Sequence, residues 1–272
     1  YFVRDILKKK NLNFTLLKSS EAKNKELLDS IKYAKRIQNA IMPSEKQLRQ
    51  LIPDGFIFYQ PKDIVAGDFY WLNKKDNNLY IASCDCTGHG VPGALVSVVC
   101  NAALNRSLKE FSLTNPSEIL DKTRELVLEE FEKSEDEVSD GMDIALIRLN
   151  GNNLSFSGAN NPLWIVRNNT NLLEEIKGCK QSIGLTNDPT PFVTHELNLN
   201  TGDCIYIFTD GYSDQFGGPK GKKFKTKAFK YLLLSIQKNS MDEQKIIIEE
   251  TFENWRGDLD QLDDVSVIGV KI

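Results

Sequence analysis

Apolar residues in the first part of the chain recur at helical spacing. Between residues 21 and 42 they lie three or four positions apart, at Leu27, Ile31, Ala34, Ile37 and Ile41. This spacing is typical of a coiled-coil seam, although a short amphipathic helix lying on a domain shows the same pattern. We interpret the stretch as a signalling helix that pairs with its own copy and ends before Pro43. Residues 1–20 mix lysine with apolar positions and are predicted to be helical as well.

Beyond residue 50, short apolar runs alternate with turn-forming residues, a pattern typical of β-strands. Strands are predicted at 56–60, 61–71, 79–85, 143–149, 153–157, 163–167, 194–199, 204–209 and 265–272. Hairpin turns are predicted at 77–78 and 150–151, so that 68–72 pairs with 79–85 in antiparallel fashion. The first hairpin would place Asp68 and Asp85 at comparable levels near its open end.

Longer apolar stretches with helical periodicity separate these strands. Helices are predicted at 91–111, 116–133, 225–237 and 241–255, and Pro116 suits the first turn of the second one. Residues 134–141 are acidic and are predicted to form a mobile loop, and residues 168–190 are rich in turn formers. Antiparallel strands separated by pairs of helices indicate an α+β fold, in which helices cover a sheet core.

The composition limits the classes of protein that the chain can represent. It has 272 residues, of which 40% are hydrophobic, enough for one large domain or a domain with an appendage. The net charge is −4, yet residues 1–50 hold 12 Lys and Arg against 5 Asp and Glu. This basic part has few aromatic residues and no groove-binding motif, which argues against nucleic-acid binding.

The cysteines and the apolar runs predict a cytoplasmic location. No run of 18 apolar residues exists in the sequence, so no membrane span is predicted. The five cysteines are an odd set, and several lie in apolar patterns, which fits free buried thiols in a reducing compartment. Because the sequence starts at Tyr1, we expect the cytoplasmic part of a longer protein, with an upstream sensor or a membrane anchor before it.

Four aspartates lie at the edges of apolar strands, namely Asp68, Asp85, Asp210 and Asp264. Asp85 ends one strand, and a glycine-rich turn then leads into a helix, an arrangement that suits a cation or a phosphate. Each aspartate on its own is most simply a solvated carboxylate or a turn residue. Four that converge repel one another unless hard cations neutralise them, and oxygen-only ligands select Mg²⁺ or Mn²⁺ over zinc.

Two such ions can activate a water molecule and hold a phosphoryl group for in-line attack, without a nucleophilic side chain. No nucleophilic residue is evident in the sequence, which has no Gly-x-Ser-x-Gly motif and only two histidines. The aspartates therefore predict a metal-dependent phosphoryl hydrolase.

Four short motifs carry a family resemblance. They are Ala-Gly-Asp68-Phe-Tyr, Asp85-Cys-Thr-Gly-His-Gly-Val-Pro-Gly-Ala, Thr-Asp210-Gly and Asp263-Asp264-Val-Ser. Their order, spacing and flanking residues resemble those of SpoIIE-type serine/threonine phosphatases, members of the metal-dependent PPM superfamily, over about residues 51–272. The segment Gly-Ala-Asn-Asn161-Pro162-Leu is also similar to the family segment Gly-His-Asn-Pro-Pro-Leu.

This resemblance implies a β-sandwich of two antiparallel sheets flanked by helices (α-β-β-α), with two Mn²⁺ or Mg²⁺ ions between the sheets. It implies that Asp85 bridges both ions, that the Cys86 carbonyl ligates one, and that the shell is completed, partly through water, by Asp68, Asp210 and Asp264. The implied substrate is a phosphoserine or phosphothreonine on a protein in a bacterial signalling pathway, often a small anti-sigma-factor antagonist.

The resemblance also implies a division of the chain. Residues 1–50 are similar to the linker helix through which such phosphatases form homodimers and receive signals from an upstream sensor. Residues 51–272 are similar to the phosphatase domain. A twist or register change in the helix that ends at Ile41 would then move the 91–111 helix and the Asp85 turn. A truncation that starts near Leu51 is therefore expected to alter activity or dimerisation.

The chain departs from the family pattern in three places. Ala66 stands where the family usually has glycine, which adds only a methyl group, and Asn160 stands where the family often has histidine. The phosphate-binding arginine of eukaryotic relatives has no clear counterpart. Lys62, six residues before Asp68, is the candidate substitute. His89 is either a turn residue or a second group facing the substrate phosphate.

Three other interpretations remain open. Cys84-x-Cys86-x-x-His89 resembles half of a zinc site, but a structural zinc needs four ligands, and strand alternation turns both cysteines away from Asp85. A Gly-Asp pair before the last Asp-Asp imitates one motif of haloacid-dehalogenase-type phosphatases, whose Asp-x-Asp motif is absent from the end of the first strand. The third is a catalytically inactive PPM-fold signalling or dimerisation module, which would be expected to lack one of the aspartates.

Overall fold

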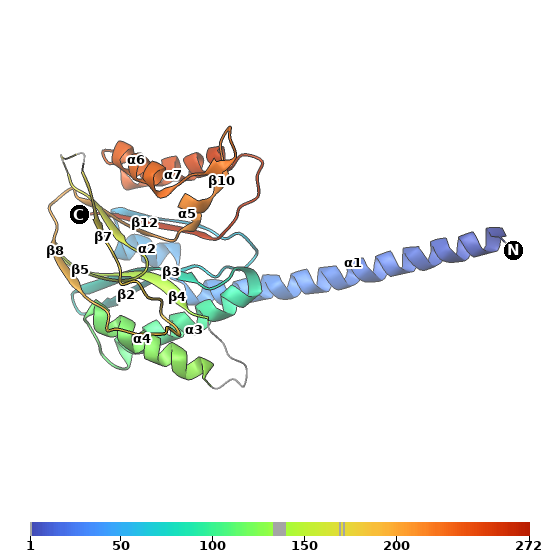
Figure 1. The fold of residues 1–272 in the computed structure, drawn as a ribbon, viewed down its shortest axis with the longest axis horizontal. Coiled ribbons are helices and arrows are strands. Elements are labelled where there is room, and N and C mark those ends of the chain that lie inside the picture. The colour runs from blue at the N-terminus through green and yellow to red at the C-terminus, as the bar shows by residue number, and fades with distance from the viewer. Residues whose placement is uncertain (1, 133–139, 169, 171) are drawn as a thin grey trace.

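One long helix and two stacked β-sheets make up the chain in the computed structural model (Figure 1). The structure describes residues 2–132, 140–168, 170 and 172–272, with side chains for all of these except 3–12 and 15. The acidic loop predicted at 134–141 therefore lies almost entirely outside the described residues. Within the described ranges, no helix combines the length and the apolar character needed to cross a membrane.

Helix α1 (Phe2–Ile41) projects away from the sheets (Figure 1). It ends just before Pro43, as predicted, because the residue preceding a proline is disfavoured in the helical conformation. Two residues of the predicted seam are open to solvent, since Leu27 is 61% and Ile37 is 52% exposed, whereas the other three, Ile31, Ala34 and Ile41, are half-buried. An amphipathic helix gains most of its stability by burying its apolar stripe. The pairing of α1 with a second copy would do so, and it stays a prediction.

The two main sheets have five strands each, and all their strand pairs are antiparallel. The first sheet has the order β1 (Gly55–Gln60), β12 (Val265–Lys271), β9 (Cys204–Phe208), β6 (Leu163–Val166), β7 (Leu173–Ile176). The second has the order β2 (Phe69–Lys75), β3 (Asn78–Cys86), β4 (Met142–Asn150), β5 (Asn153–Ala159), β8 (His195–Asn198). A separate small hairpin consists of β10 (Phe216–Gly217) and β11 (Lys222–Lys223).

Helices cover the outer face of each sheet (Figure 1). The second sheet carries α3 (Gly90–Lys109) and α4 (Pro116–Phe131), and the first carries α6 (Thr226–Ile236) and α7 (Met241–Arg256). Two short helices are α2 (Glu45–Leu51) and α5 (Gly211–Asp214). Three apolar layers result, one between the sheets and one under each helical pair. This is the predicted α-β-β-α sandwich.

Strand β3 shows how side-chain alternation builds two of these layers. Ile81 packs between the sheets, whereas Ala82, Cys84 and Cys86 pack under α3 and α4. Both thiols are free and buried, as predicted. Asp85 belongs to the opposite side of the strand, so the cysteines contribute to packing while the carboxylate stays available for the space between the sheets.

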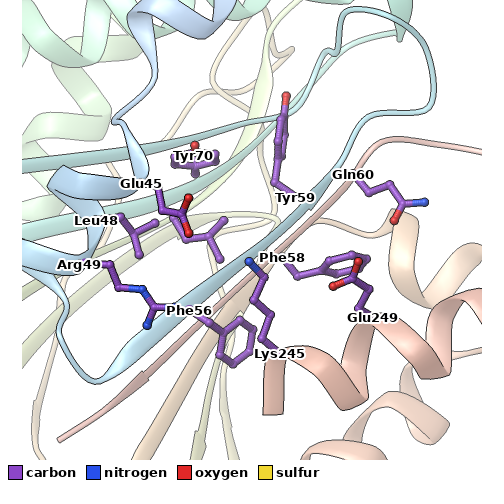
Figure 2. A pocket seen from close by; sticks show the side chains of 11 residues that line it. Glu45, Leu48, Arg49, Phe56, Phe58, Tyr59, Gln60, Tyr70, Lys245 and Glu249 are labelled. Atoms are coloured by element: carbon purple, nitrogen blue, oxygen red, sulfur yellow. The ribbon is translucent and has the colours of Figure 1, made fainter. Parts of the chain in front are cut away.

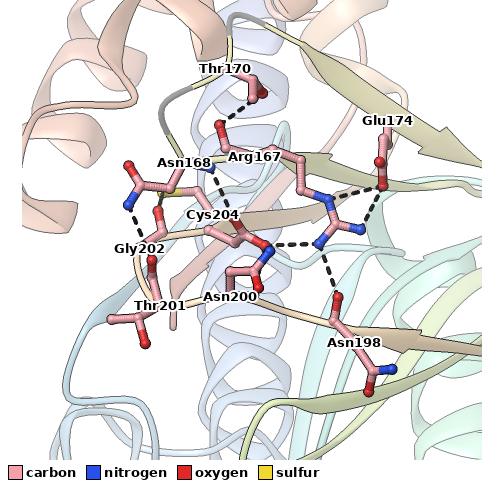
Figure 3. Close-up of polar contacts among 10 residues, drawn as sticks. Arg167, Asn168, Thr170, Glu174, Asn198, Asn200, Thr201, Gly202 and Cys204 are labelled. Atoms are coloured by element: carbon pink, nitrogen blue, oxygen red, sulfur yellow. Dashed lines mark hydrogen bonds and ion pairs between the residues drawn. The ribbon is translucent and has the colours of Figure 1, made fainter.

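Arg167 ties the end of β6 to three neighbouring segments (Figure 3). Its guanidinium donates to Asp203 Oδ2 and Glu174 Oε2, each at 2.8 Å, and to the Asn198 carbonyl oxygen at 3.0 Å. Glu174 lies on β7 of the first sheet, and Asn198 ends β8 of the second. Charge-assisted hydrogen bonds of this kind are among the stronger polar contacts. The cluster therefore joins the two sheets.

The structure differs from the predicted strands at residues 61–68, which form a loop, so that β2 begins only at Phe69. Hydrogen bonding explains the difference. The N–H groups of Lys62 and Gly67 donate to the Asp264 carboxylate, each at 2.7 Å, and not to a neighbouring strand.

Smaller differences concern turns and short elements. The first hairpin turn lies at Asp76–Asn77, one residue earlier than predicted, and Asp76 has φ +53°. Aspartate tolerates this left-handed conformation better than most residues. The hydrophobic pattern did not predict α2, α5, β7, β10 or β11, because runs of two to seven residues show too few periods to recognise.

Candidate metal centre

Three neighbouring strands bring acidic residues to one level of the second sheet. The β2–β3 register pairs Phe69 with Cys84, so Asp68 and Asp85 lie opposite each other one step further on. On its other side, Asp85 pairs with Asp143 of β4. The predicted levels of Asp68 and Asp85 are confirmed, and Asp143 joins them.

Glycines allow the loop before β2 to pack directly on the turn after β3. A Cβ atom on Gly67 would lie 2.2 Å from the Gly88 carbonyl oxygen, and a Cβ on Gly93 would lie 2.1 Å from it. Gly88 has φ +80°, a left-handed conformation that glycine adopts without strain. Glycines at these positions thus allow the Asp68 loop, the Asp85 turn and the start of α3 to pack in direct contact.

A cavity of about 220 Å³ opens where these segments meet. Its acidic lining residues come from four places along the chain and are Asp85, Asp143, Asp210 and Asp263. Residues 86–89, Met142 and Ser182 complete the lining. Asp210 follows β9 and Asp263 precedes β12, two neighbouring strands of the first sheet, whereas Asp85 and Asp143 belong to the second sheet. Both sheets therefore contribute carboxylates to one cavity.

Burial and mutual repulsion disfavour ionisation of these carboxylates. Asp68 is 3% exposed, and burial followed by repulsion from Asp85 raises its pKa well above the usual value. Burial, then repulsion from Asp210 and Asp263, raises the pKa of Asp85 in the same way. Partial burial, then repulsion from Asp214 and Asp263, raises the pKa of Asp210 to about 6. A bound cation would reverse these shifts by favouring the ionised forms.

The donor set suits a hydrated hard cation. Asp68 Oδ2 is buried and accepts no hydrogen bond from any described residue, and an orphaned buried oxygen of this kind is costly unless a ligand satisfies it. In the described part of the chain, no three His, Cys, Asp or Glu side chains lie close enough together to hold a metal ion by themselves. Mg²⁺ usually keeps several waters and uses only one or two carboxylates, which matches an open cavity. The zinc alternative at Cys84 and Cys86 has no support.

Two adjacent aspartates before β12 play different parts. Asp263 lines the cavity. Asp264 is 2% exposed and does not line it; its carboxylate accepts N–H bonds from Lys62 and Gly67 at 2.7 Å each, and from Asp68 at 3.4 Å. Asp264 thus holds the Asp68 loop in place. The sequence reasoning selected Asp264 for the cavity and left out Asp263, although neighbouring residues beside a strand tend to point to opposite sides.

Asp143 and Ser182 were also missed from the sequence. Asp143 Oδ1 accepts hydrogen bonds from Ser182 Oγ at 2.6 Å and from Asn160 Nδ2 at 2.9 Å. Asn160 has φ +55°, a conformation in which asparagine is enriched. Asn160, which stands where the family often has histidine, therefore orients the carboxylate of Asp143 in the cavity. No sequence signal marked Ser182, which lies in the turn-rich stretch.

The two candidate phosphate-binding residues lie together beside the cavity. Lys62 Nζ lies 2.9 Å from His89 Nε2, and His89 Nδ1 lies 2.8 Å from Asp63 Oδ2. His89 lines the cavity, whereas Lys62 reaches it through the imidazole. Since an ammonium group only donates, Nε2 of His89 is the acceptor in the contact with Lys62, and Nδ1 faces the Asp63 carboxylate. The ammonium charge of Lys62 is thus held next to the cavity.

Residues 75–272 match the family model for stage II sporulation protein E, SpoIIE. The chain belongs to the SpoIIE family. The match starts within β2 and runs to the last residue, so it includes Asp85, Asp143, Asp210 and Asp263. Asp68 and helix α1 lie before it. The family match therefore covers the whole lining of the acidic cavity and the strands from β3 onward, but not helix α1, strand β1 or most of β2.

Solved structures and curated proteins include relatives of this SpoIIE domain. Phosphoserine phosphatase RsbU of Bacillus subtilis is 26% identical over 196 residues, which are 70% of this chain and 55% of RsbU. The chain thus spans about half of the length of that relative. The SiaA-PP2C domain of Pseudomonas aeruginosa is 29% identical, with a TM-score of 0.82, and the match covers 92% of this chain and 98% of that one. RsbX in complex with magnesium shares the fold at 14% identity and a TM-score of 0.54, over 79% of this chain and 92% of RsbX.

The raised pKa of Asp210 predicts a pH effect on the metal-free SpoIIE domain. The pKa of Asp210 is about 6 in the folded state, against its ordinary value of 3.8. The folded state therefore binds the Asp210 proton more tightly than the unfolded state does. The stability that the bound proton contributes is full below pH 3.8 and is lost as the pH rises through about 6. In EDTA, we expect Asp210→Asn to raise the melting temperature relative to wild type above pH 6 and much less near pH 4. Asp258→Asn, on an exposed loop, is the control, and an equal effect of Asp210→Asn at both pH values would contradict the prediction.

Proposed function

We propose that this SpoIIE domain is a metal-dependent protein phosphatase that hydrolyses phosphoserine or phosphothreonine in a bacterial signalling pathway. The observation that carries the proposal is the convergence of Asp85, Asp210 and Asp263 from both sheets on one cavity. Burial and repulsion raise the pKa of Asp85 and of Asp210 there, as expected of carboxylates placed to receive cations. When bound, two Mn²⁺ or Mg²⁺ ions would supply an activated water and would neutralise the phosphoryl oxygens.

The residues that would hold the ions are those that face the cavity. The proposed ligands are Asp85, the carbonyl of Cys86, Asp210 and Asp263. Asp68 lies level with Asp85, and its buried, unpaired oxygen would act partly through water. Asp264 becomes a positioning residue in this proposal, since its carboxylate holds the loop that carries Asp68. These proposed ligands are those that the family resemblance implies, except that Asp263 takes the place of Asp264.

Lys62 and His89 would recognise the phosphate. The Lys62 ammonium group would attract a dianion to the cavity, and it contacts the His89 imidazole, which lines the cavity. Both side chains contact each other in the structure, although they lie 27 positions apart in the chain. This pair would take the part that the phosphate-binding arginine has in eukaryotic relatives.

The substrate is proposed from the relatives. RsbU is named a phosphoserine phosphatase, which supports a phosphorylated serine or threonine on a protein, such as a small anti-sigma-factor antagonist. An inactive signalling module is the alternative. The retention of every proposed aspartate ligand supports catalysis over that alternative.

Hydrolysis of p-nitrophenyl phosphate and of a phosphoserine peptide, with Mn²⁺, with Mg²⁺ and with EDTA, tests the proposed function. Turnover that requires the metal and disappears in EDTA is the expected result. Calorimetric titration with Mn²⁺ completes the test if turnover is absent. Tight binding would indicate an enzyme held inactive by its helix, whereas no binding and no turnover would end the phosphatase proposal.

Helix α1 contacts the site through a buried glutamine. Gln38 is 4% exposed; its Nε2 donates to the Ala66 carbonyl oxygen at 2.6 Å and to Ser97 Oγ at 3.0 Å, and its Oε1 accepts the Ala66 N–H at 3.1 Å. Ala66 lies two residues before Asp68, and Ser97 lies on α3. We propose that pairing of α1 with its copy in a homodimer, under control of an upstream sensor, sets the position of these two elements.

Gln38→Ala is expected to lower the turnover number for p-nitrophenyl phosphate by about tenfold or more, since small displacements of catalytic groups have effects of that size. Gln50→Ala, on the exposed side of α2, is the matched control and should leave turnover unchanged. Steady-state kinetics and analytical ultracentrifugation should be run in parallel on a chain that starts at Leu51. Unchanged turnover in Gln38→Ala, together with unchanged activity and association in the shortened chain, would contradict the proposed switch.

A further inference from the structure

Strand β1 leaves one of its two edges unpaired by the described chain. It is the first strand of its sheet and pairs only with β12. In an antiparallel ladder, alternate residues turn both backbone groups toward the partner strand. The Lys271 N–H donates to the Asp54 carbonyl oxygen, so Asp54 faces β12, and so does every second residue after it. Phe56 and Phe58 therefore bond to β12, whereas Ile57 and Tyr59 turn their N–H and C=O groups outward.

A groove of about 340 Å³ runs along this outward edge (Figure 2). Five consecutive residues of β1, 56–60, line it, so the groove follows the strand backbone. Leu48 and Tyr70 line it on the side of the second sheet, and the rings of Phe56 and Phe58 lie toward α7. Its volume falls within the range of about 300–1,000 Å³ that ligand sites have.

No described residue hydrogen bonds to the outward backbone groups of Ile57 and Tyr59. The helices on either side also restrict what can reach them, since α2 borders one side of the groove and α7 the other (Figure 2). A sheet edge from a second copy would have to enter the space between these two helices to reach β1. A single extended segment is the shape that fits between them and meets the backbone groups.

The rims of the groove carry charges of both signs. Lys245 and Glu249 lie on α7, one helical turn apart, and Glu45 and Arg49 lie on α2 at the same spacing. Arg49 pairs with Asp242 at 2.7 Å, whereas Glu45, Lys245 and Glu249 form no ion pair with a described residue. These groups are therefore available to a partner that itself carries charges of both signs.

We propose that an extended segment of a protein partner binds along β1 as an added strand. Its backbone would pair with Ile57 and Tyr59, as in other cases of strand addition. Because side chains alternate along a strand, every second residue would face Leu48 and Tyr70 and would be apolar. The residues between them would face Lys245 and Glu249 and would carry complementary charges. The site lies outside the acidic cavity, so it serves recruitment and not hydrolysis.

The test starts from a phage-displayed library of random nine-residue peptides, selected on the intact protein. Selected peptides are synthesised with a fluorophore, and their affinity is measured by fluorescence anisotropy. The groove variant exchanges two rim charges, Lys245→Glu with Glu249→Lys, so that the net charge is unchanged. The control variant, Lys238→Glu with Glu250→Lys, makes the same exchange at exposed positions outside the groove. Hydrolysis of p-nitrophenyl phosphate by both variants should equal that of wild type.

We expect the groove variant to bind the selected peptides about tenfold more weakly and the control to bind them as wild type does, because two exposed charge pairs are lost. Amide hydrogen exchange, followed by NMR, should slow at Ile57 and Tyr59 on peptide binding and stay unchanged at Phe56 and Phe58. Failure to enrich any peptide, equal affinity for both variants, or unchanged exchange at Ile57 and Tyr59 would each overturn the proposal. The last result would show that a peptide docks in the groove without adding a strand.

Discussion

Asp85→Asn is expected to lower Mn²⁺-dependent hydrolysis of p-nitrophenyl phosphate by about 1,000-fold, since a metal ion contributes several kcal/mol to such reactions. Asp85 lines the cavity and lies level with Asp68 on one neighbouring strand and with Asp143 on the other. An amide at this position removes the charge that the proposed cations would share. It leaves the shape of the side chain nearly unchanged.

The same substitution should not weaken the metal-free fold. Burial and the repulsion from Asp210 and Asp263 raise the pKa of Asp85, which means that its ionised form is destabilised in the folded state. In EDTA at neutral pH, the melting temperature of Asp85→Asn should therefore equal or exceed that of wild type. Asp258→Asn serves as the control for both measurements. A variant that keeps metal-dependent turnover, or a loss of turnover explained by unfolding in EDTA, would contradict the assignment of Asp85.

Asp263→Asn is expected to weaken metal binding, whereas Asp264→Asn is expected to weaken the fold. Asp263 faces the cavity, so its amide should weaken Mn²⁺ binding about tenfold or more while the melting temperature in EDTA stays near that of wild type. Asp264 accepts three backbone N–H bonds in a buried position. Burial raises the pKa of Asp264 too, so loss of its charge alone should not destabilise the protein. An asparagine, however, keeps only one acceptor oxygen and turns an NH2 group toward a buried N–H donor, which should destabilise the metal-free protein by about 2 kcal/mol.

Calorimetric titration with Mn²⁺ and thermal unfolding in EDTA separate the two roles. The expected outcome is that Asp263→Asn loses Mn²⁺ affinity but not stability, and that Asp264→Asn loses stability. If Asp264→Asn lost affinity without losing stability while Asp263→Asn bound Mn²⁺ normally, the ligand set read from the sequence would stand and the exchange proposed from the structure would be wrong. The two residues are neighbours of the same type, so each is the matched control of the other.

Local patterns alone were enough to predict most of the elements. The 3.5-residue spacing up to Ile41 predicted the long helix, and the apolar runs predicted the strands that became β1, β3, β9 and β12. These predictions succeed because residues within one element interact over short distances along the chain. The hairpin between β2 and β3 also follows from local signals, and it brings Asp68 level with Asp85. The four motifs in order were enough to assign the family before any contact was known.

The local patterns predicted the wrong structure where backbone groups form hydrogen bonds with residues far away in the sequence. Residues 61–68 look like a strand, yet the Asp264 carboxylate, about 200 positions away, takes the N–H groups of Lys62 and Gly67. Short elements such as α2 and β7 carry too few residues for a periodic signal. Asp143 and Ser182 show no motif of their own, because their importance comes only from what lies beside them.

Patterns in the sequence were enough to predict the class of fold, the family and the position of the carboxylates at strand ends. The packing of distant segments was needed to show which carboxylates share a cavity and which hold a loop. Side-chain alternation predicts that Asp263 and Asp264 point to different sides, but it does not predict on which side the cavity lies. That depends on how the Asp68 loop packs against the Asp85 turn at Gly67 and Gly88, a contact between distant segments. The open edge of β1 is decided in the same way, because a strand becomes an edge only through the order of the whole sheet.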